Sequence, residues 1–210
     1  MSRARPATPR GRRAAGKAVA LTVPPGCRLF VGRRSFWRLC AANRDLRLER
    51  EASGELVIMA PAGSETGHRN AGVTGQLWAW SRDDGTGLSF DSSTGFTLPN
   101  GKVCSPDASW VLKGRWEALA VEQREKFAPI CPDFVVELRS SSNEMTDLRV
   151  KMLEYLEQGI RLGWLLDPKN DVVEIYRPGR PVEILKRPQT LSGEDVLPGF
   201  VLDLRGIFFD

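Results

Sequence analysis

Residues 132–143 read PDFVVELRSSSN, an apolar and β-branched run with one carboxylate, Glu137, near its far end. A continuously apolar run of this kind is typical of a strand at the centre of a sheet that is covered on both faces. An unpaired carboxylate is costly to bury, so Glu137 must be paired, protonated or bound to a metal ion. The surroundings of Glu137 therefore connect the fold of this stretch to its chemistry.

A helix is predicted directly after this strand, over residues 144–159. Leu148 and Tyr155 belong to its apolar face, and Gly159 is suited to end it. Lys151 lies at the edge of that face. Its stem can pack against the core while its amine reaches toward the strand ends.

The rest of the chain alternates between helix and strand signals. Downstream, we expect a buried strand over 162–168, a hairpin with a Pro-Gly turn over 171–185, and a strand with a short helix over 197–208. Upstream, we expect a helix over residues 35–44, a β-hairpin that turns at Gly54 over 46–61, and a helix capped by Ser64 over 64–84. One or two strands over 87–101, a short strand over 105–113 and a partly helical connector over 115–132 follow. This order predicts an α/β or α+β fold, a sheet flanked by helices.

Length and charge suggest one domain behind a basic arm. The 210 residues suffice for a sizeable core, and no apolar run approaches the roughly 20 residues that span a bilayer, so we expect a cytoplasmic protein. Residues 1–44 hold 11 of the 30 Lys and Arg residues and no acid, which leaves 19 basic and 26 acidic residues in the remainder. We expect residues 1–17 to be a disordered basic arm and residues 18–210 to be a single acidic domain. Nucleic-acid binding must then rest on a local site rather than on bulk charge.

Histidine and cysteine chemistry is limited, because the chain has one histidine, His68, and four scattered cysteines without a CxxC pair. A two-histidine zinc motif is excluded within one chain, and neither a zinc knuckle nor a disulfide framework is expected. The G-x-S-x-G, GxxxxGK[ST] and GxGxxG motifs are absent, so serine hydrolases, P-loop enzymes and Rossmann enzymes lack support. Carboxylates and lysines remain, and carboxylates favour hard cations such as Mg²⁺ or Mn²⁺.

Two carboxylates are candidates for one metal site. Asp107 opens a predicted strand directly after Pro106, and Glu137 lies in the next apolar strand, 30 residues later. If these strands are neighbours, both carboxylates face one spot at the edge of the sheet and can hold a divalent ion. A lysine there can orient or deprotonate the attacking water and stabilise charge on a phosphate, and Lys151 is placed for this role.

These residues carry a family resemblance. The segments SPD at 105–107 and ELR at 137–139 resemble the PD-(D/E)xK nuclease pattern, and residues 35–207 as a whole resemble the Uma2 family of restriction-endonuclease-like proteins. The family's ordered string P-D-x-x-x-E, S, D-x-x-x-K-x-x-x-Y, G and W-x-x-D-P is matched by Pro132, Asp133, Glu137, Ser140, Asp147, Lys151, Tyr155, Gly159, Trp164, Asp167 and Pro168.

The resemblance implies a restriction-endonuclease-like fold, with a central mixed β-sheet between helices, an N-terminal β-hairpin and a C-terminal hairpin. It also implies a Mg²⁺- or Mn²⁺-dependent endonuclease that acts on DNA, with Asp107 and Glu137 as metal ligands. Arg139 stands where the nuclease pattern has its lysine, so Lys151 is the expected substitute, and Arg139 is a possible additional site residue. An additional acid is expected from Glu49 or Glu65, with a slight preference for Glu49.

Other interpretations remain open at this point. Glu137 and Arg139 can form a structural ion pair, and Asp147 with Lys151 can be a pair on a helix surface. His68 fits a surface or capping position, and Asp133 can cap the strand entrance by accepting backbone hydrogen bonds. The chain can also be a catalytically inactive DNA-binding or assembly protein that keeps the nuclease fold, or a hydrolase of another phosphoester. A homodimer is expected if both DNA strands are cut, since this needs two sites.

Overall fold

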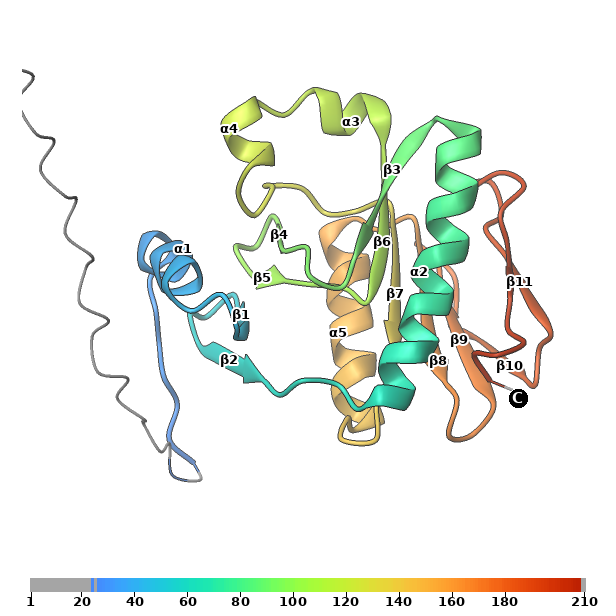
Figure 1. Ribbon diagram of the computed structural model, residues 1–210, viewed down its shortest axis with the longest axis horizontal. Coiled ribbons are helices and arrows are strands. Elements are labelled where there is room, and N and C mark those ends of the chain that lie inside the picture. The colour runs from blue at the N-terminus through green and yellow to red at the C-terminus, as the bar shows by residue number, and fades with distance from the viewer. Residues whose placement is uncertain (1–23, 25, 209–210) are drawn as a thin grey trace, which may run out of the picture.

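The computed structural model describes Pro24 and residues 26–208 (Figure 1). The predicted arm, residues 1–17, lies outside the described residues, and the single domain over residues 18–210 stays a prediction. No helix among the described residues is long and apolar enough to cross a membrane.

A six-stranded mixed sheet forms the centre of the molecule, in the order β10-β9-β8-β7-β6-β3. The strands β7 and β8 are parallel, and the other neighbouring pairs are antiparallel. In chain order the bounds are β3 Gly87–Asp91, β6 Ala108–Leu112, β7 Phe134–Leu138, β8 Leu162–Asp167, β9 Val172–Tyr176 and β10 Glu183–Lys186. The mixed sheet and the C-terminal hairpin β9–β10 confirm the sequence prediction.

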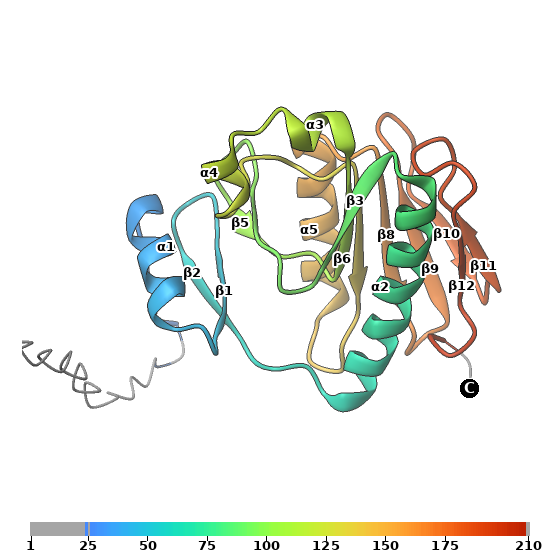
Figure 2. The ribbon, with the colours of Figure 1, turned by 45° about the horizontal axis from the view of Figure 1, so that its top comes forward.

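The apolar run within residues 132–143 forms the buried strand β7, with a helix on each side (Figures 1 and 2). Phe134 and Val136 belong to the core beneath α2, Ser64–Asp84, whereas Val135 packs in the core beneath α5, Met145–Gln158. Because side chains alternate along a strand, Glu137 falls on the α5 side. This alternation directs the one carboxylate of the strand toward the helix that carries Lys151.

The predicted helices form with small shifts at their ends. Gly63, not Ser64, is the N-cap residue of α2, and Ser64 is its first helical residue. Both long helices end at a glycine in the left-handed region, α2 at Gly85 with φ 70° and α5 at Gly159 with φ 105°. The connector contains the short helices α3 Lys113–Glu117 and α4 Val121–Arg124.

A second sheet, β2-β1-β5-β4, lies beside the central one. Its strands are β1 Arg47–Arg50, β2 Leu56–Met59, β4 Phe96–Thr97 and β5 Val103–Cys104. The predicted N-terminal hairpin is confirmed as β1–β2, whose connection contains Gly54 with φ 99°. Directly after β5 the chain enters β6, so the two sheets meet at residues 105–107.

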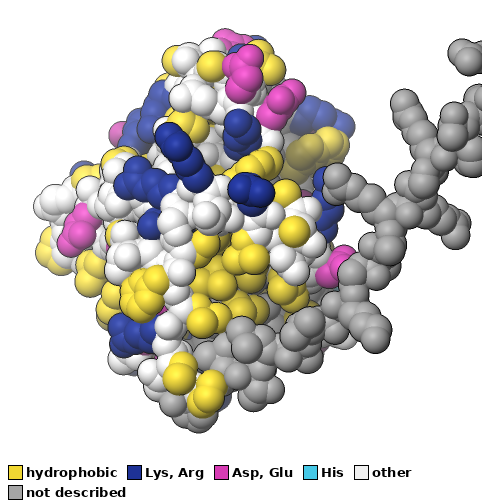
Figure 3. All heavy atoms as spheres, turned by 90° about the vertical axis from the view of Figure 1, so that its left-hand side faces the viewer, with side chains coloured by type: hydrophobic (Ala, Val, Ile, Leu, Met, Phe, Trp, Pro, Cys, Tyr) yellow, Lys and Arg dark blue, Asp and Glu magenta, His cyan; other side chains and the backbone are white. Residues whose placement is uncertain are grey.

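The helix α1, Arg33–Ala42, packs through Phe36 and leaves its arginines exposed. Figure 3 looks onto the side that carries α1, where Lys and Arg side chains gather near an apolar area. This helix confirms the helical prediction for residues 35–44 with a shift of two residues toward the N-terminus at both ends.

The short helix predicted at the end of residues 197–208 is not formed. A small two-stranded sheet, β11 Thr190–Ser192 with β12 Val201–Asp203, is followed by a turn instead. Gly206 has φ 74°, which a helix does not allow, and the amides of Ile207 and Phe208 both donate to the Leu204 carbonyl. Ile207 and Phe208 are buried, so core packing decides this conformation over helix propensity.

Candidate active site

Asp107 and Glu137 lie side by side at one end of the central sheet. The strands β6 and β7 pair antiparallel with Ala108 opposite Val136, which places Asp107, just before β6, beside Glu137. Asp107 Oδ2 accepts a hydrogen bond of 2.8 Å from the Leu138 amide. The condition for a shared site, that the two strands are neighbours, is therefore met.

Lys151 reaches this pair of acids from α5. Its Nζ lies 2.9 Å from Glu137 Oε1 and 3.5 Å from Glu49 Oε1. The side chains of Glu137 and Lys151 are only 5% and 14% exposed, so the charges meet largely away from water. The helix lysine thus reaches the strand ends as the sequence predicts, and it pairs with Glu137 rather than with Asp147 on its own helix surface.

Of the two upstream glutamates, only Glu49 joins the cluster. Glu49 is buried on β1, and its Oε1 accepts a 2.8 Å hydrogen bond from the Ser105 amide. Glu65, in the first turn of α2, is exposed and pairs with Arg69 at 2.9 Å. The slight preference for Glu49 agrees with its position, and Glu65 lies outside the cluster.

Arg139 points away from the acids. Its Nη1 lies 3.2 Å and 3.0 Å from the two carboxylate oxygens of Asp167, and its backbone amide donates to the Leu166 carbonyl. Because β7 and β8 run parallel, Asp167 at the end of β8 lies beside Arg139 just after β7. The structural ion pair considered for Arg139 is real, but its partner is Asp167 and not Glu137.

The remaining sequence candidates have structural positions. Asp133 is buried, accepts a 2.9 Å hydrogen bond from the Leu112 amide and pairs with Arg115 at 2.8 Å. It caps the strand entrance as expected. His68 is exposed on α2, and Asp147 is exposed at the pocket mouth.

Tyr155 is a site residue that the sequence reasoning assigned only to the core. Its hydroxyl donates a 3.0 Å hydrogen bond to Glu137 Oε1, the same oxygen that Lys151 contacts. The i,i+4 spacing of Lys151 and Tyr155 on one helix face was the available signal. Both residues hold Glu137 from the same side.

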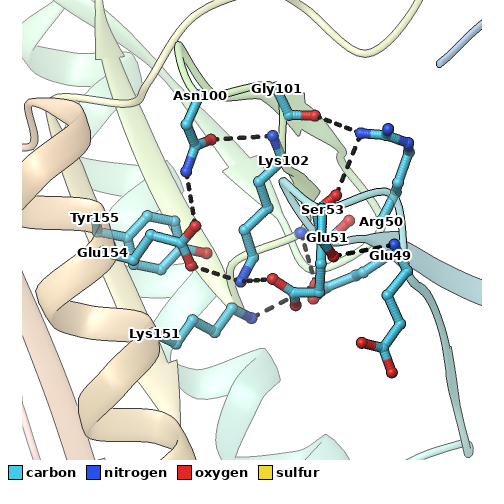
Figure 4. A network of polar contacts seen from close by, with 12 residues as sticks. Glu49, Arg50, Glu51, Ser53, Asn100, Gly101, Lys102, Lys151, Glu154 and Tyr155 are labelled. Carbon is cyan, nitrogen blue, oxygen red and sulfur yellow. Dashed lines mark hydrogen bonds and ion pairs between the residues drawn. The ribbon is translucent and has the colours of Figure 1, made fainter. Parts of the chain in front are cut away.

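A second polar network, centred on the buried Lys102, lies beside the cluster (Figure 4). Lys102 Nζ lies 2.9 Å from Glu51 and 2.7 Å from Glu154, and the Asn100 amide group donates to Glu154 at 2.7 Å. These residues come from the end of β1, the turn before β5, and α5. The network ties the hairpin that carries Glu49 to the helix that carries Lys151, and no sequence spacing indicated it.

The family pattern named Uma2, described as "Putative restriction endonuclease", matches residues 34–205. The chain belongs to the Uma2 family. No curated protein sequence matches it.

Among solved structures, the Uma2 chain is similar to a "putative nuclease belonging to DUF820" from Anabaena variabilis ATCC 29413. The TM-score is 0.65 at 19% sequence identity, and the match covers 77% of this chain and 89% of that one. At this identity the likeness concerns the fold, which is restriction-endonuclease-like, as predicted.

Burial and charge set the protonation of the Uma2 cluster. Burial raises the pKa of Glu137 to about 7; Lys151 opposes this, whereas Asp107 and Glu49 add to it. Burial also raises the pKa of Asp107, against the hydrogen bond from Leu138. Burial disfavours the charged form of Lys151, but Glu137 and Glu49 outweigh it and hold the pKa of Lys151 well above its ordinary value. The cluster therefore keeps Lys151 positively charged and disfavours the ionised forms of Asp107 and Glu137.

The cluster opens into a pocket of about 800 Å³ between the hairpin, the N-terminal ends of α2 and α5, and the strand ends. Six acids and three bases line it: Glu49, Glu51, Asp107, Glu137, Asp147 and Glu154, with Arg47, Lys102 and Lys151. The Uma2 pocket is thus strongly acidic, which suits a cation more than a bare anion.

The carboxylate oxygens of the cluster are of the ligand type that hard divalent cations such as Mg²⁺ prefer. Among the described residues, no three Asp, Glu, His or Cys side chains are grouped closely enough to hold a metal ion as they stand. Two carboxylates from adjacent strand ends nevertheless meet at an open pocket, where Mg²⁺ can keep several of its waters. One of them, Glu137, has a raised pKa, and a nearby cation would lower that pKa by favouring the ionised carboxylate.

Proposed function

We propose that this Uma2 protein is a Mg²⁺- or Mn²⁺-dependent endonuclease that hydrolyses phosphodiester bonds in DNA. The observation that carries the proposal is the meeting of Asp107 and Glu137 at adjacent strand ends, with the Lys151 ammonium 2.9 Å from Glu137. The description of the family as restriction endonucleases and the named nuclease of similar fold support it.

Asp107 and Glu137 are the residues that would hold the ion, with Glu49 as an additional acid. When bound, the ion supplies a Lewis acid that polarises the scissile phosphate and lowers the pKa of a bound water. Tyr155 and Lys151 fix the orientation of Glu137 through one carboxylate oxygen. The chain thus holds its acids in one conformation before substrate arrives.

Lys151 takes the part of the lysine that the strand lacks. Its neighbours keep it charged, so in this role it orients water and stabilises negative charge that develops on the phosphate, rather than acting as a neutral base. Arg139 has no such role in the proposal, because both oxygens of Asp167 hold its guanidinium.

One observation favours a second candidate function. Arg139 occupies the position where the nuclease pattern has its lysine, and it forms an ion pair with Asp167. Lys151 contacts Glu137 as closely as in a structural ion pair. A catalytically inactive nuclease fold that binds DNA or assembles with partners has these features as well.

The proposed function includes a cellular location and an oligomeric state for the protein. We place the protein in the cytoplasm, a choice supported by four cysteines that are all free. We also propose a homodimer, because cutting both strands of a duplex requires two active sites.

Incubation of the purified protein with supercoiled plasmid in Mg²⁺, in Mn²⁺ and in EDTA tests the function. The isosteric variants Asp107→Asn and Glu137→Gln are compared with the parent, and calorimetric titration measures their Mg²⁺ affinity. We expect metal-dependent nicking or linearisation by the parent, and loss of both cleavage and ion binding in the two variants.

Two other results have distinct meanings. Equal cleavage by parent and variants shows that the metal site lies elsewhere. Plasmid binding without cleavage in either ion supports the inactive DNA-binding protein, and cleavage of a small phosphodiester but not of DNA points to another phosphoester substrate.

A further inference from the structure

The three basic side chains of the pocket are in different states. Lys151 lies within 4 Å of two carboxylates, and so does Lys102. Arg47 forms no ion pair with any residue in the described part of the chain. Two of the three positive charges are therefore already neutralised by the protein, and Arg47 is the cation left over for a ligand.

The position of Arg47 directs it into the pocket. Arg47 and Glu49 are two residues apart on β1, so their side chains share one face of the strand. Both line the pocket. Arg50, on the alternate face, donates to three backbone carbonyls instead and does not line it.

The guanidinium of Arg47 is anchored at one corner only. One Nη2–H donates a 3.1 Å hydrogen bond to the Ser92 carbonyl. Over Pro24 and residues 26–208, its Nε and Nη1 have no hydrogen-bond partner. Arg47 and Asp107, the first proposed metal ligand, line the same pocket, and the positive charge of Arg47 opposes the rise in the Asp107 pKa that burial causes.

We propose that Arg47 binds a phosphate of the DNA strand next to the proposed metal site. This inference deepens the proposed function and rests on it. A polyanion that approaches a pocket lined by six acids is repelled, and the two paired lysines offer little compensation. A guanidinium presents a planar fork that matches two phosphate oxygens, and the unpaired Nε and Nη1 of Arg47 are available for such contacts.

A structural role for Arg47 makes a different prediction. If the side chain only fixes the turn at Ser92, its removal lowers stability and leaves the salt dependence of DNA binding unchanged. If it binds a phosphate, its removal lowers the log–log salt slope by about 0.9, the value for one phosphate of duplex DNA.

Loss of the metal ion cannot imitate this effect. Arg47 is a positive charge near Asp107, so its removal favours cation binding there. A weaker affinity for DNA in an Arg47 variant then arises from the lost phosphate contact and not from an emptier metal site.

Fluorescence anisotropy with a labelled duplex, in Ca²⁺ and over 50 to 200 mM salt, tests the inference, with the DNA checked by gel to be intact. Arg47→Gln removes the charge and Arg47→Lys keeps it without the fork. Arg82→Gln is the matched control, an exposed arginine about 24 Å along α2 from the pocket residue Thr66.

We expect Arg47→Gln to weaken binding about tenfold at the lowest salt and to reduce the slope by about 0.9. We expect Arg47→Lys to keep the slope and lose affinity severalfold, and Arg82→Gln to match the parent. Melting curves establish that each variant is folded. If Arg47→Gln does not fold, Arg47→Lys becomes the test, and an unchanged DNA affinity in that variant would refute the proposed contact between the guanidinium and a phosphate.

The opposite results separate two failures. If the parent cleaves DNA and Arg47→Gln keeps its affinity and slope, the inference about Arg47 is wrong while the proposed function stands. If the parent neither binds nor cleaves DNA at any salt concentration, the proposed function and this inference are both overturned.

Discussion

Lys151 and Glu137 form a 2.9 Å ion pair although one residue comes from α5 and the other from the centre of the sheet. The strand cation nearest to Glu137 in sequence, Arg139, is held instead by Asp167. The ammonium that contacts Glu137 therefore comes from the helix, whereas Glu137 itself comes from a strand, which makes the two contributions separable by mutation.

Replacing Lys151 by methionine should remove cleavage while metal binding persists. The side chain keeps its volume but loses its charge, and removing one group that stabilises charge in the transition state typically costs a factor of about 10² to 10³. Mg²⁺ affinity should be kept or improved, because a positive charge beside Glu137 disappears. Plasmid cleavage rates and calorimetric titration measure the two effects, with the exposed Lys113→Met as control. Parental rates in Lys151→Met would exclude a catalytic role for this ammonium.

Replacing Arg139 by methionine should lower stability and spare the chemistry. Among the described residues, Asp167 is left buried with the Asn170 side-chain amide, at 2.7 Å, as its one remaining side-chain partner. Breaking a buried pair in this way costs about 3–5 kcal/mol, measured by urea denaturation. The added change Asp167→Asn should restore part of the loss. A folded Arg139→Met that no longer cleaves DNA would place the essential cation on the strand.

Without metal, the protein should lose stability as the pH rises from about 4.5 to about 7. The native pKa of Glu137 is raised from 4.5 to about 7, so within this window the folded state binds more protons than the unfolded state. Ionisation of Glu137 then costs the folded state on the order of 3 kcal/mol. The pKa of Lys151 is raised above 10.5, so its contribution does not change in this window.

Urea denaturation in EDTA at a series of pH values checks this expectation. The difference between the parent and Glu137→Gln isolates the glutamate from all other groups, and it should grow with pH and shrink when Mg²⁺ is added. Parallel stability curves for the two proteins would show that Glu137 ionises normally.

Replacing Lys102 by methionine should loosen the hairpin. The Lys102 side chain is 6% exposed, and its loss leaves the carboxylates of Glu51 and Glu154 facing each other without the ammonium that lies near both. Because the two glutamates are partly exposed, we expect a loss of about 1–3 kcal/mol in thermal or urea unfolding. Adding Glu51→Gln and Glu154→Gln should recover part of it, since two neutral side chains no longer repel. No recovery would mean that packing by the Lys102 stem, rather than charge balance, stabilises the hairpin.

Much of this arrangement follows from local patterns. The apolar run of β7, the helical spacing in α5 and the glycine at residue 159 predict their elements, because each depends on neighbours in the sequence. The short helix near the C-terminus fails as a prediction, since the burial of Ile207 and Phe208 outweighs local propensity.

The candidate site was predictable where topology has few options. Antiparallel neighbours bring Asp107 beside Glu137, and a helix edge brings Lys151 to them. The partners of Arg139 and Lys102 were not predictable, because each lies at least 28 residues away in the chain, and such pairings depend on the packing of whole elements. The choice between Glu49 and Glu65 needed the same information.

The cluster straddles a seam between two sheets, since Glu49 belongs to the four-stranded sheet and Glu137 to the six-stranded one. The two sheets can separate at this boundary while each keeps its own hydrogen bonds. Assembly of the site and folding of the chain therefore have separate free energies. Gentle warming should therefore abolish cleavage before the central sheet melts. Amide hydrogen exchange should show the same order, with β1 opening more readily than β7.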